Sequence, residues 1–187
     1  MDKQQKPKTE KFFADTHTTW GHKWGYKDTK FILNEDRSVR MVGDRYELCG
    51  SDMPDFIPYV EEMLDITIDP NDRLSEIENK PIREPNINEK FVEQVKFTFP
   101  EDRYTFSDDD RLIHSHGQTT SEEVYKILYS EISRNVDMVF YLESEEEGVK
   151  LINLAKQFDV CLVPFGGGTS VSSALQIPES ETRMVVA

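Results

Sequence analysis

Cysteine is scarce in this sequence, and long hydrophobic runs are missing from it. Cys49 and Cys161 are the only cysteines among 187 residues, which excludes a disulfide-rich secreted scaffold and favours a reducing compartment. No stretch of 18 consecutive apolar residues occurs, whereas a membrane-spanning helix needs about 20. Residues 1–8 also lack the apolar segment of a secretory signal.

Positive charge is also in short supply. The chain has 22 Lys and Arg residues against 36 Asp and Glu residues, a formal net charge of −14 at pH 7. A surface of that sign repels nucleic acid at long range, so no nucleic-acid partner is predicted. Aromatic residues make up 11% of the chain, which argues against a wholly disordered protein. The length is that of one ordinary domain with a buried core.

The first 117 residues carry scattered structural signals. Residues 1–10 are polar, and we predict a disordered tail there. The elements predicted after it are a hairpin over residues 31–41, a short helix over 53–64, an exposed proline-rich connector over 65–90 and a second short helix over 88–95. We therefore expect residues 11–117 to form a largely helical and irregular N-terminal extension.

The remaining residues predict regular structure. Two S/T-x-x-E pairs, which are typical of capping boxes, stand in front of amphipathic segments. They predict one helix that starts after Thr120 and extends to Ile132, and another over residues 145–157. Apolar runs over 136–142 and 160–163 predict buried strands on either side of the second helix, and this order predicts a right-handed βαβ unit. The apolar end over 184–187 predicts a further strand that is cut short, as in a fragment.

Three consecutive glycines follow the second of these strands. Glycine has no Cβ and reaches positive φ freely, so the N–H groups of such a run can converge on one anion. Because ligands favour the carboxyl edge of a parallel sheet, the run predicts a diphosphate site built from backbone dipoles, with hydroxyl donors beside it. We expect positive φ and close ligand approach at Gly167. The candidate cofactor-binding residues are Pro164, Phe165, Gly166, Gly167, Gly168, Thr169 and Ser170.

The run differs from two other phosphate-binding motifs. It is not G-x-G-x-x-G, and it lacks the lysine of a P-loop, so triphosphate hydrolysis is not predicted. A flexible linker or a tight turn between a strand and the next element has the same composition without binding a ligand. At this stage both of those interpretations stay open.

Two histidines raise the question of a metal or acid–base site. His114 and His116 are two positions apart, and histidine serves in both kinds of site. No third ligand stands at a suitable spacing. We therefore predict a polar turn before a helix, and no metal site.

The segment from Pro164 to Ser172 resembles the pyrophosphate loop of the vanillyl-alcohol-oxidase-type (PCMH-type) FAD-binding domain. More narrowly, it is similar to the alkyldihydroxyacetonephosphate synthase (alkylglycerone-phosphate synthase) family, whose loop reads Pro-x-Gly-Gly-Gly-Thr-Ser-Val-Ser and is followed by Pro-x-x-Glu-x-Arg. Here residues 178–183 fit the second pattern. The resemblance implies an α+β fold, in which residues 118–187 form the first, truncated βαβ unit of the FAD-binding domain.

Two upstream segments make the resemblance specific to the synthase family. Residues 20–31 resemble the family's Trp-x-Gly-Trp-Gly-Tyr-x-Asp-(Ser/Thr)-Lys-Phe with one extra residue, and residues 45–50 resemble its Arg-Tyr-x-Leu-Ser-Gly. There are also departures. His114 and Gln118 do not match the family's Arg-x-x-Arg-x-His-Gly-His run, and Leu142 stands where such flavin domains usually have proline.

The resemblance implies a reaction, a cofactor and a location. The reaction exchanges the acyl chain of acyl-dihydroxyacetone phosphate for a fatty alcohol in ether lipid biosynthesis, with FAD as cofactor and no net redox. The family further implies a peroxisomal homodimer with peripheral membrane association. The catalytic residues are expected beyond residue 187, so none is assigned here, and this chain alone is expected to be inactive and to bind FAD weakly.

Two other functions stay open on the sequence alone. An FAD-dependent 2-hydroxyacid dehydrogenase of the same superfamily would carry the glycine loop, but it would not need the Trp-Gly-Tyr segment. A non-catalytic anion-binding or interaction module would use the acidic residues 107–110, which are predicted to form a solvated turn, as a docking surface. Flavin absorbance separates the two enzymes from the module, and turnover without an electron acceptor separates the synthase from the dehydrogenase.

Overall fold

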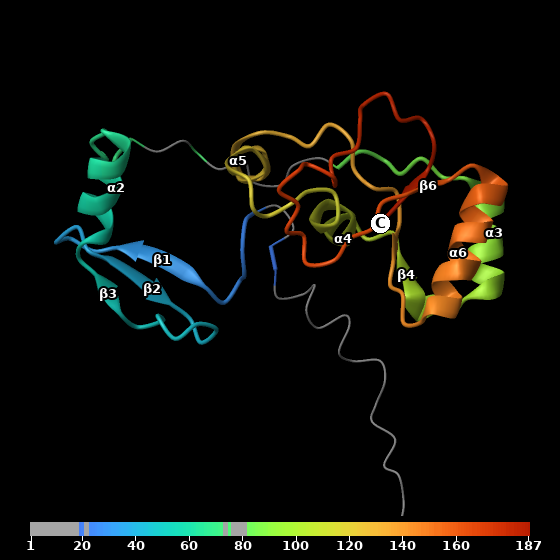
Figure 1. The fold of residues 1–187 in the computed structure, drawn as a ribbon, viewed down its shortest axis with the longest axis horizontal. Coiled ribbons are helices and arrows are strands. Elements are labelled where there is room, and N and C mark those ends of the chain that lie inside the picture. Colours follow the sequence, from blue (N-terminus) through green and yellow to red (C-terminus); the bar gives the residue numbers. More distant parts are fainter. Residues whose placement is uncertain (1–18, 21–22, 73–74, 76–81) are drawn as a thin grey trace, which may run out of the picture. The chain divides into compact units, whose positions relative to one another are not determined.

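The computed structural model describes residues 19–20, 23–72, 75 and 82–187. The chain divides into two compact units, a smaller one over residues 25–76 and a larger one over residues 1–24 and 77–187. Figure 1 shows both units, with elements of each labelled. The tail predicted over residues 1–10 lies outside the described residues.

The smaller unit is built on an antiparallel sheet in the order β1 (Lys30–Leu33), β2 (Val39–Val42) and β3 (Asp52–Met53). The register of the first pair runs from Lys30 opposite Val42 to Leu33 opposite Val39, which confirms the predicted hairpin. The third strand was not predicted. It contains Met53, which the helix pattern had included, so part of the extension expected to be helical and irregular is a sheet.

Helix α2 (Phe56–Leu64) follows this sheet. A helix was predicted over residues 53–64, and it begins later than expected. Phe56 and Leu64, which the helical pattern puts on one apolar face with Val60, are 46% and 63% exposed. The buried residue of the helix is Ile57.

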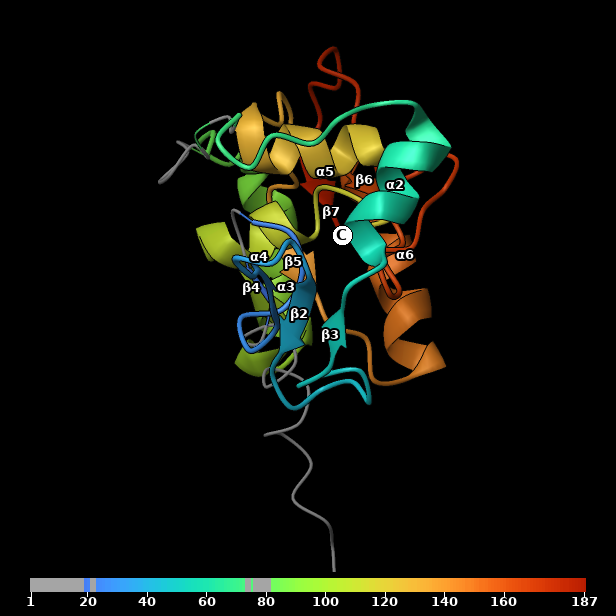
Figure 2. The same ribbon diagram turned by 90° about the vertical axis from the view of Figure 1, so that its left-hand side faces the viewer.

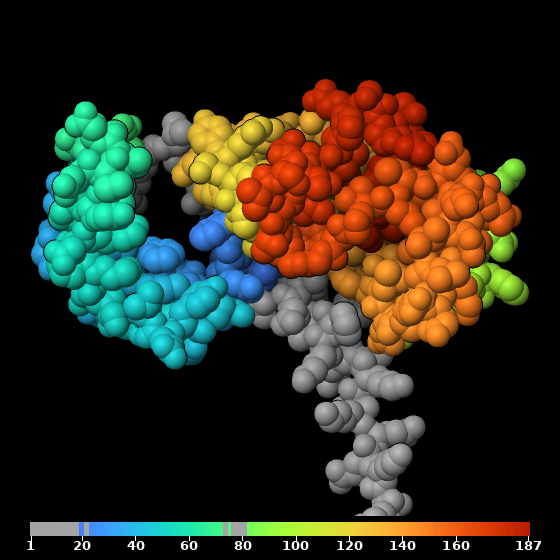
Figure 3. Space-filling view, in the orientation of Figure 1, coloured from blue at the N-terminus to red at the C-terminus, as the bar shows by residue number. Residues whose placement is uncertain are grey.

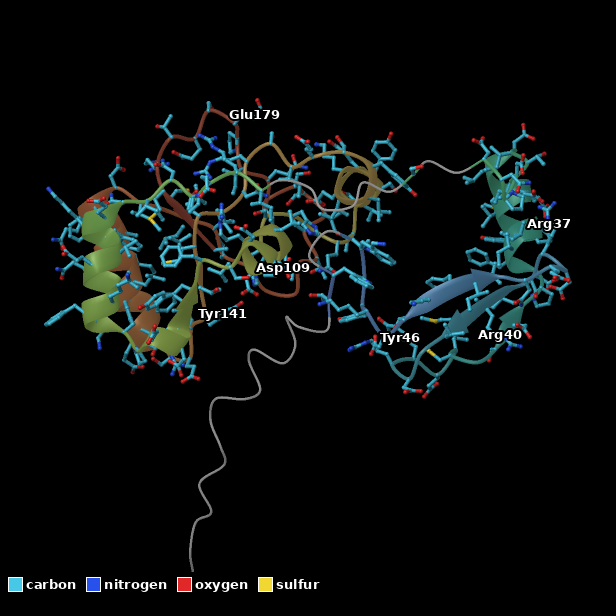
Figure 4. The ribbon with its side chains drawn as sticks, turned by 180° about the vertical axis from the view of Figure 1, so that it is seen from behind. Arg37, Arg40, Tyr46, Asp109, Tyr141 and Glu179 are labelled. Atoms are coloured by element: carbon cyan, nitrogen blue, oxygen red, sulfur yellow. The ribbon has the colours of Figure 1, made fainter. Side chains whose placement is uncertain are left out.

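The two N-terminal segments that carry the family resemblance meet in the smaller unit. The guanidinium of Arg45 donates to both carboxylate oxygens of Asp28, at 3.3 and 3.1 Å, and lies 3.7 Å from the ring centroid of Tyr26. An ion pair and a cation–π contact therefore join the segments. Arg40, labelled in Figure 4, ties β2 to β3 through a two-point contact with Asp52, at 2.7 and 2.5 Å.

The larger unit contains the helices α3 (Glu89–Thr98), η1 (Glu101–Arg103), α4 (Asp108–Ile113), α5 (Ser121–Tyr129) and α6 (Glu145–Phe158). α3 and α6 pack side by side (Figure 1). The side chain of Asn88 starts α3 by accepting from the Phe91 N–H at 3.1 Å, and it donates to the Phe158 carbonyl at the end of α6 at 2.9 Å. The helices predicted over 88–95 and 145–157 are confirmed.

The strands of the larger unit are β4 (Tyr104–Thr105), β5 (Val139–Phe140), β6 (Cys161–Leu162) and β7 (Val185–Val186). β4 pairs antiparallel with β5, and β6 pairs parallel with β7 (Figure 2). A parallel bridge between Met138 and Val186 joins the two pairs, so the order is β4, β5, β7, β6. The predicted strands are confirmed, but the last strand in the chain lies between the other two.

The sheet is buried on both faces, because successive residues of a strand point to opposite sides. Phe140 and Val186 belong to a cluster with residues of α3 and α6, including Phe91 and Leu151. Their chain neighbours Val139 and Val185, with Val136, form a second cluster against Tyr141 and Ile177. Burial on both faces explains why these strands read as continuous apolar runs.

Two local expectations for the larger unit need correction. The acidic run was predicted to be a solvated turn, but its aspartates form the first turn of α4, where carboxylates favour the helix N-terminus. Asp108 accepts from the side chain of buried Arg111 at 2.8 Å. Helix α5 begins after Thr120 as predicted, yet ends at Tyr129, before Ile132. Within the described residues, no helix combines the length and apolar character needed to span a bilayer.

Candidate functional site

The glycine run lies directly after β6, where the parallel strands β6 and β7 present their carboxyl ends. In Figure 3 the segment after β6 lies at the surface of the larger unit. Gly166, Gly167 and Thr169 are exposed, and Gly168 is buried. Among the hydrogen bonds between described residues, none has an amide N–H of residues 166–170 as its donor. These amides are therefore free to bind something else.

The three glycines have different surroundings. Gly168 has a φ of +69°, and a Cβ there would lie 3.0 Å from Phe165 Cζ. A Cβ on Gly166 would meet nothing within 4 Å, and one on Gly167 would have Thr169 Cγ2 as its nearest neighbour at 3.8 Å. The expectation of positive φ at Gly167 is therefore wrong, because within this run positive φ occurs at Gly168. The backbone conformation at position 168 therefore requires glycine, whereas positions 166 and 167 have open space where a Cβ would stand.

A strap formed by Gln118 and Thr119 holds the carbonyl side of this loop. The Gln118 amide N–H donates to the Gly168 carbonyl at 2.8 Å, and the Thr119 hydroxyl donates to the Ser170 carbonyl at 3.1 Å. The indole N–H of Trp24 in turn donates to the Gln118 carbonyl at 3.0 Å. In a trans peptide the N–H and C=O point in opposite directions, so the Thr169 N–H points away from Gln118.

A cavity of about 490 Å³ adjoins the loop, within the size range of small-molecule sites. Pro164 and Phe165 line it together with residues of β5, β6, β7 and α6. Its polar lining side chains are His114 and Tyr141, and the others are apolar. Leu142, which stands where the related flavin domains have proline, is also part of the lining. The cavity and the free amides lie at the same edge of the sheet.

The two histidines lie in the turn between α4 and α5, as predicted, but they are buried. His114 follows α4, and its Nδ1 lies 2.7 Å from the Asp110 carbonyl. Its ring centroid lies 4.5 Å from that of Phe165 and 5.8 Å from that of Tyr141. Burial holds the pKa of His114 below its ordinary value. Across the described part of the chain, no three His, Cys, Asp or Glu side chains gather in a way that could hold a metal ion.

The segment that returns from the loop to β7 carries the Pro-x-x-Glu-x-Arg pattern. Arg183 donates to both carboxylate oxygens of Glu181, at 2.9 and 2.6 Å, and this contact lowers the pKa of Glu181 to about 2. Glu179, labelled in Figure 4, is exposed on the same segment. The pattern therefore fixes the backbone close to β7.

A buried ion pair anchors this return. Asp137, which is fully buried, accepts from Arg134 at 2.9 and 2.6 Å and from the backbone N–H groups of Asn86 and Val185 at 2.8 and 2.7 Å. Arg134 also donates to the Arg183 carbonyl at 3.0 Å. The carboxylate thus joins the start of β7 to the segment before β5, with every partner a donor.

Sequence reasoning missed the residues that support the loop. Asp137 had a usable signal, because a lone charge inside an apolar run must find a partner when it is buried. Gln118 acts through its backbone N–H and C=O groups, and Thr119 acts through its hydroxyl. Nothing in the sequence marks these two residues as contacts of the loop. Trp24 was noticed only as part of a motif, without its contact.

No family model matches the chain, but similar proteins exist. An alkyldihydroxyacetonephosphate synthase of Caenorhabditis elegans is 36% identical over 168 residues, which is 87% of this chain and 27% of that protein. Proteins of the same name from Trypanosoma brucei brucei and Dictyostelium discoideum are 28% and 26% identical over 57% and 59% of this chain, and over 17% and 18% of their own lengths. The chain thus spans about a quarter or less of these relatives.

Solved structures extend the similarity to the fold. Two crystal structures of alkyldihydroxyacetonephosphate synthase, in space groups P1 and P212121, align with TM-scores of 0.75 and 0.73 at 20% identity. Each alignment covers 91% of this chain, but 32% and 31% of the solved chains. The chain therefore has the mixed α+β fold of a part of those structures.

Proposed function

We propose that this chain, which is homologous to alkyldihydroxyacetonephosphate synthase over a short portion of that enzyme, forms the first section of the FAD-binding domain of such a synthase. The proposed reaction exchanges the acyl chain of acyl-dihydroxyacetone phosphate for a fatty alcohol in ether lipid biosynthesis. The observation that carries the cofactor assignment is the glycine run at the carboxyl ends of β6 and β7, whose amide N–H groups donate to no described residue.

The residues of the loop fit the diphosphate of FAD. No charged side chain occurs between Asp159 and Glu179, so this segment itself offers an anion only N–H and O–H dipoles. The open space at Gly166 and Gly167 permits close approach. The residues that would hold the cofactor are Pro164, Phe165, Gly166, Gly167, Gly168, Thr169 and Ser170.

The surrounding residues would orient the cofactor and exclude water. The strap from Gln118 and Thr119 holds the loop carbonyls toward the protein, so the N–H groups do not have to reorganise when an anion binds. Pro164 and Phe165 line the apolar cavity, from which a bound ring would displace water. The flavin, when bound, would supply the chemistry of a chain exchange that needs no net redox.

The synthase assignment is favoured over a 2-hydroxyacid dehydrogenase by the relatives described above, each of which is named as a synthase. The contact between Arg45, Asp28 and Tyr26 supports it as well, because those residues belong to segments typical of the synthase family. Peroxisomal location, a homodimer and peripheral membrane contact are proposed with the function and rest on the same homology.

A chimera tests the proposal. The homologous portion of the Caenorhabditis elegans synthase is replaced by this chain, and the product is purified with FAD and assayed with acyl-dihydroxyacetone phosphate and a labelled fatty alcohol, without an electron acceptor. We expect a yellow protein that forms the alkyl product. The same chimera with Gly167→Val should fold and remain colourless.

Two outcomes would contradict the proposal. A well-folded chimera that retains no flavin would remove the FAD assignment. A yellow chimera that turns over a 2-hydroxyacid with an electron acceptor, and does not exchange acyl for alkyl chains, would replace the synthase with a dehydrogenase. The isolated chain is expected to bind FAD weakly, so tight stoichiometric binding by residues 1–187 would contradict the view that the rest of the site lies elsewhere.

A further inference from the structure

We propose that His114 is a positioning residue that makes the glycine loop sensitive to pH, acting through Phe165 on the left-handed backbone at Gly168. This inference rests on the proposed function only for the identity of the ligand. The coupling itself depends on contacts within this chain, which form a continuous path from α4 to the loop.

The path has two steps. The His114 ring packs against the Phe165 ring, with centroids 4.5 Å apart and planes tilted by 54°. The tip of the Phe165 ring in turn lies over Gly168, at 3.0 Å from the place where a Cβ would stand. Gly168 is thus held by Phe165 on one side and by the Gln118 N–H on its carbonyl, at 2.8 Å.

The hydrogen bond of His114 determines where a proton would add. The Asp110 carbonyl can only accept, so Nδ1 carries the hydrogen across the 2.7 Å contact. The neutral ring therefore has its lone pair on Nε2, for which the described residues provide no hydrogen-bond partner. Protonation would place a charge on a buried ring that packs on Phe165 and lines the apolar cavity.

The surroundings of His114 act on that charge in both directions. Burial disfavours the cation most strongly, and His116 disfavours it as well. The hydrogen bond to the Asp110 carbonyl and the charge of Asp110, on α4, favour the cation but do not offset burial. Tyr141, after β5, faces the ring at 5.8 Å, and its hydroxyl donates to Asp110 at 3.4 Å. The loop contributes Phe165 and no charged side chain between residues 160 and 178.

Protonation therefore acts on the loop by disturbing the aromatic contact. A cationic His114 seeks water and separates from Phe165, which removes the support from one side of Gly168. The unused amides then lose their fixed arrangement, and an anion must order them when it binds. Because the pKa of His114 is lowered, this change occurs below pH 6.5, the ordinary pKa of histidine being about 6.5.

The test uses the 187-residue chain labelled with ¹⁵N. The ring nitrogens of His114 and the amide of Gly168 are followed by NMR between about pH 8 and pH 5. We expect neutral His114 to carry its hydrogen on Nδ1, and the Gly168 amide shift to titrate with the same midpoint as His114. Titration with FAD at each pH should show binding that weakens about threefold to tenfold below that midpoint, the range expected for loss of an aromatic pair.

Two variants separate positioning from charge. In Phe165→Leu, His114 should still titrate, but the Gly168 amide and the FAD affinity should no longer follow it. In His114→Phe, which keeps a ring against Phe165 but has no titratable group, both should become independent of pH. Amide shift dispersion at pH 7 identifies any variant that has lost its fold, and the other variant then serves alone.

Three results would overturn the inference. The first is a Gly168 amide shift that does not titrate with His114. The second is an FAD affinity that rises on acidification, which would mean that His114 attracts the diphosphate as a cation. The third is an unchanged pH dependence of the Gly168 shift and of the FAD affinity in Phe165→Leu. If FAD does not bind at any pH, the proposed function fails, while the titration of Gly168 without ligand still decides whether His114 positions the loop.

Discussion

The connection between β6 and β7 has two parts, an outgoing limb and a return limb, whose backbone groups differ in their hydrogen bonding. The outgoing limb, residues 163–176, has a run of five amides from 166 to 170 that donate to no described residue. The return limb, residues 177–184, is tied down by the Glu181–Arg183 pair and by Arg134, which donates to the Arg183 carbonyl. Both limbs belong to one loop, yet within the described part of the chain only the return limb has its backbone held by side-chain partners.

This difference shows how a net-acidic chain can prepare an anion site. Partners on the return limb and the strap at Gln118 fix the loop through its carbonyls, and the N–H groups of the outgoing limb are left for a ligand. The return limb thus keeps the loop in place, and the outgoing limb offers the N–H groups to a ligand. Substitutions in the return limb should therefore change stability, and most substitutions in the outgoing limb should change binding.

The largest effect on the free energy of unfolding is expected from Asp137→Asn, which changes the buried carboxylate that anchors the return limb. The change leaves Arg134, which is 2% exposed, without its buried partner, and breaking a buried ion pair costs about 3–5 kcal/mol. Urea denaturation followed by circular dichroism measures the loss. The matched control is Asp159→Asn, an exposed partner of Arg183 at 3.5 Å, which should stay within about 0.5 kcal/mol of the parent. Equal effects would mean that the buried pair does not anchor the limb.

Gly167→Val tests the outgoing limb by its effect on binding. The added side chain fills the open space beside the amides, so FAD binding should weaken about tenfold to a hundredfold, the cost of leaving one or two polar groups unpaired. Stability should change little, because beyond the chain neighbours the nearest atom to the new Cβ is Thr169 Cγ2 at 3.8 Å. An NMR titration with FAD and a urea melt on the same sample separate the two quantities. Unchanged affinity would exclude Gly167 from the site.

Gly168→Ala should behave as a backbone substitution within the outgoing limb. Its φ of +69° and the 3.0 Å approach to Phe165 oppose a Cβ, and the left-handed conformation costs an L-residue about 1–2 kcal/mol. The free energy of unfolding is compared with that of Gly166→Ala, where the new Cβ meets nothing within 4 Å. If both alanine variants are equally stable, the division of roles among the three glycines is wrong.

The smallest effect is expected from Ser170→Ala. Its hydroxyl oxygen accepts from the Ala174 N–H at 2.8 Å, and losing such a hydrogen bond costs about 0.5–1.5 kcal/mol. The unfolding midpoint should fall slightly, with Ser172→Ala as the control. A large loss of FAD binding together with little loss of stability would instead assign the Ser170 hydroxyl to the ligand.

Local elements were predictable because their signals are local. Thr120 and Ser144 cap their helices as expected, with each hydroxyl accepting from the N–H three residues later, and the apolar runs become strands. The insertion of β7 between β5 and β6 was not predictable, because parallel pairing depends on contacts between residues far apart in the sequence.

The candidate site was predictable in position but not in detail. Three glycines after a strand indicate a loop that a ligand can approach, but they do not reveal which glycine needs positive φ. That depends on Phe165, whose ring lies over Gly168, and on the strap from Gln118. Such contacts are set by the tertiary fold, as is the burial of His114.

The most direct test of the central claim is an NMR titration of the ¹⁵N-labelled chain with FAD. If the outgoing limb binds the diphosphate, the amide signals of residues 166–170 should shift most and move downfield as their N–H groups become hydrogen-bonded, and ADP should reproduce these shifts. If those five amides stay unchanged while other residues shift, or if nothing shifts at saturating FAD, the glycine run is not a cofactor site.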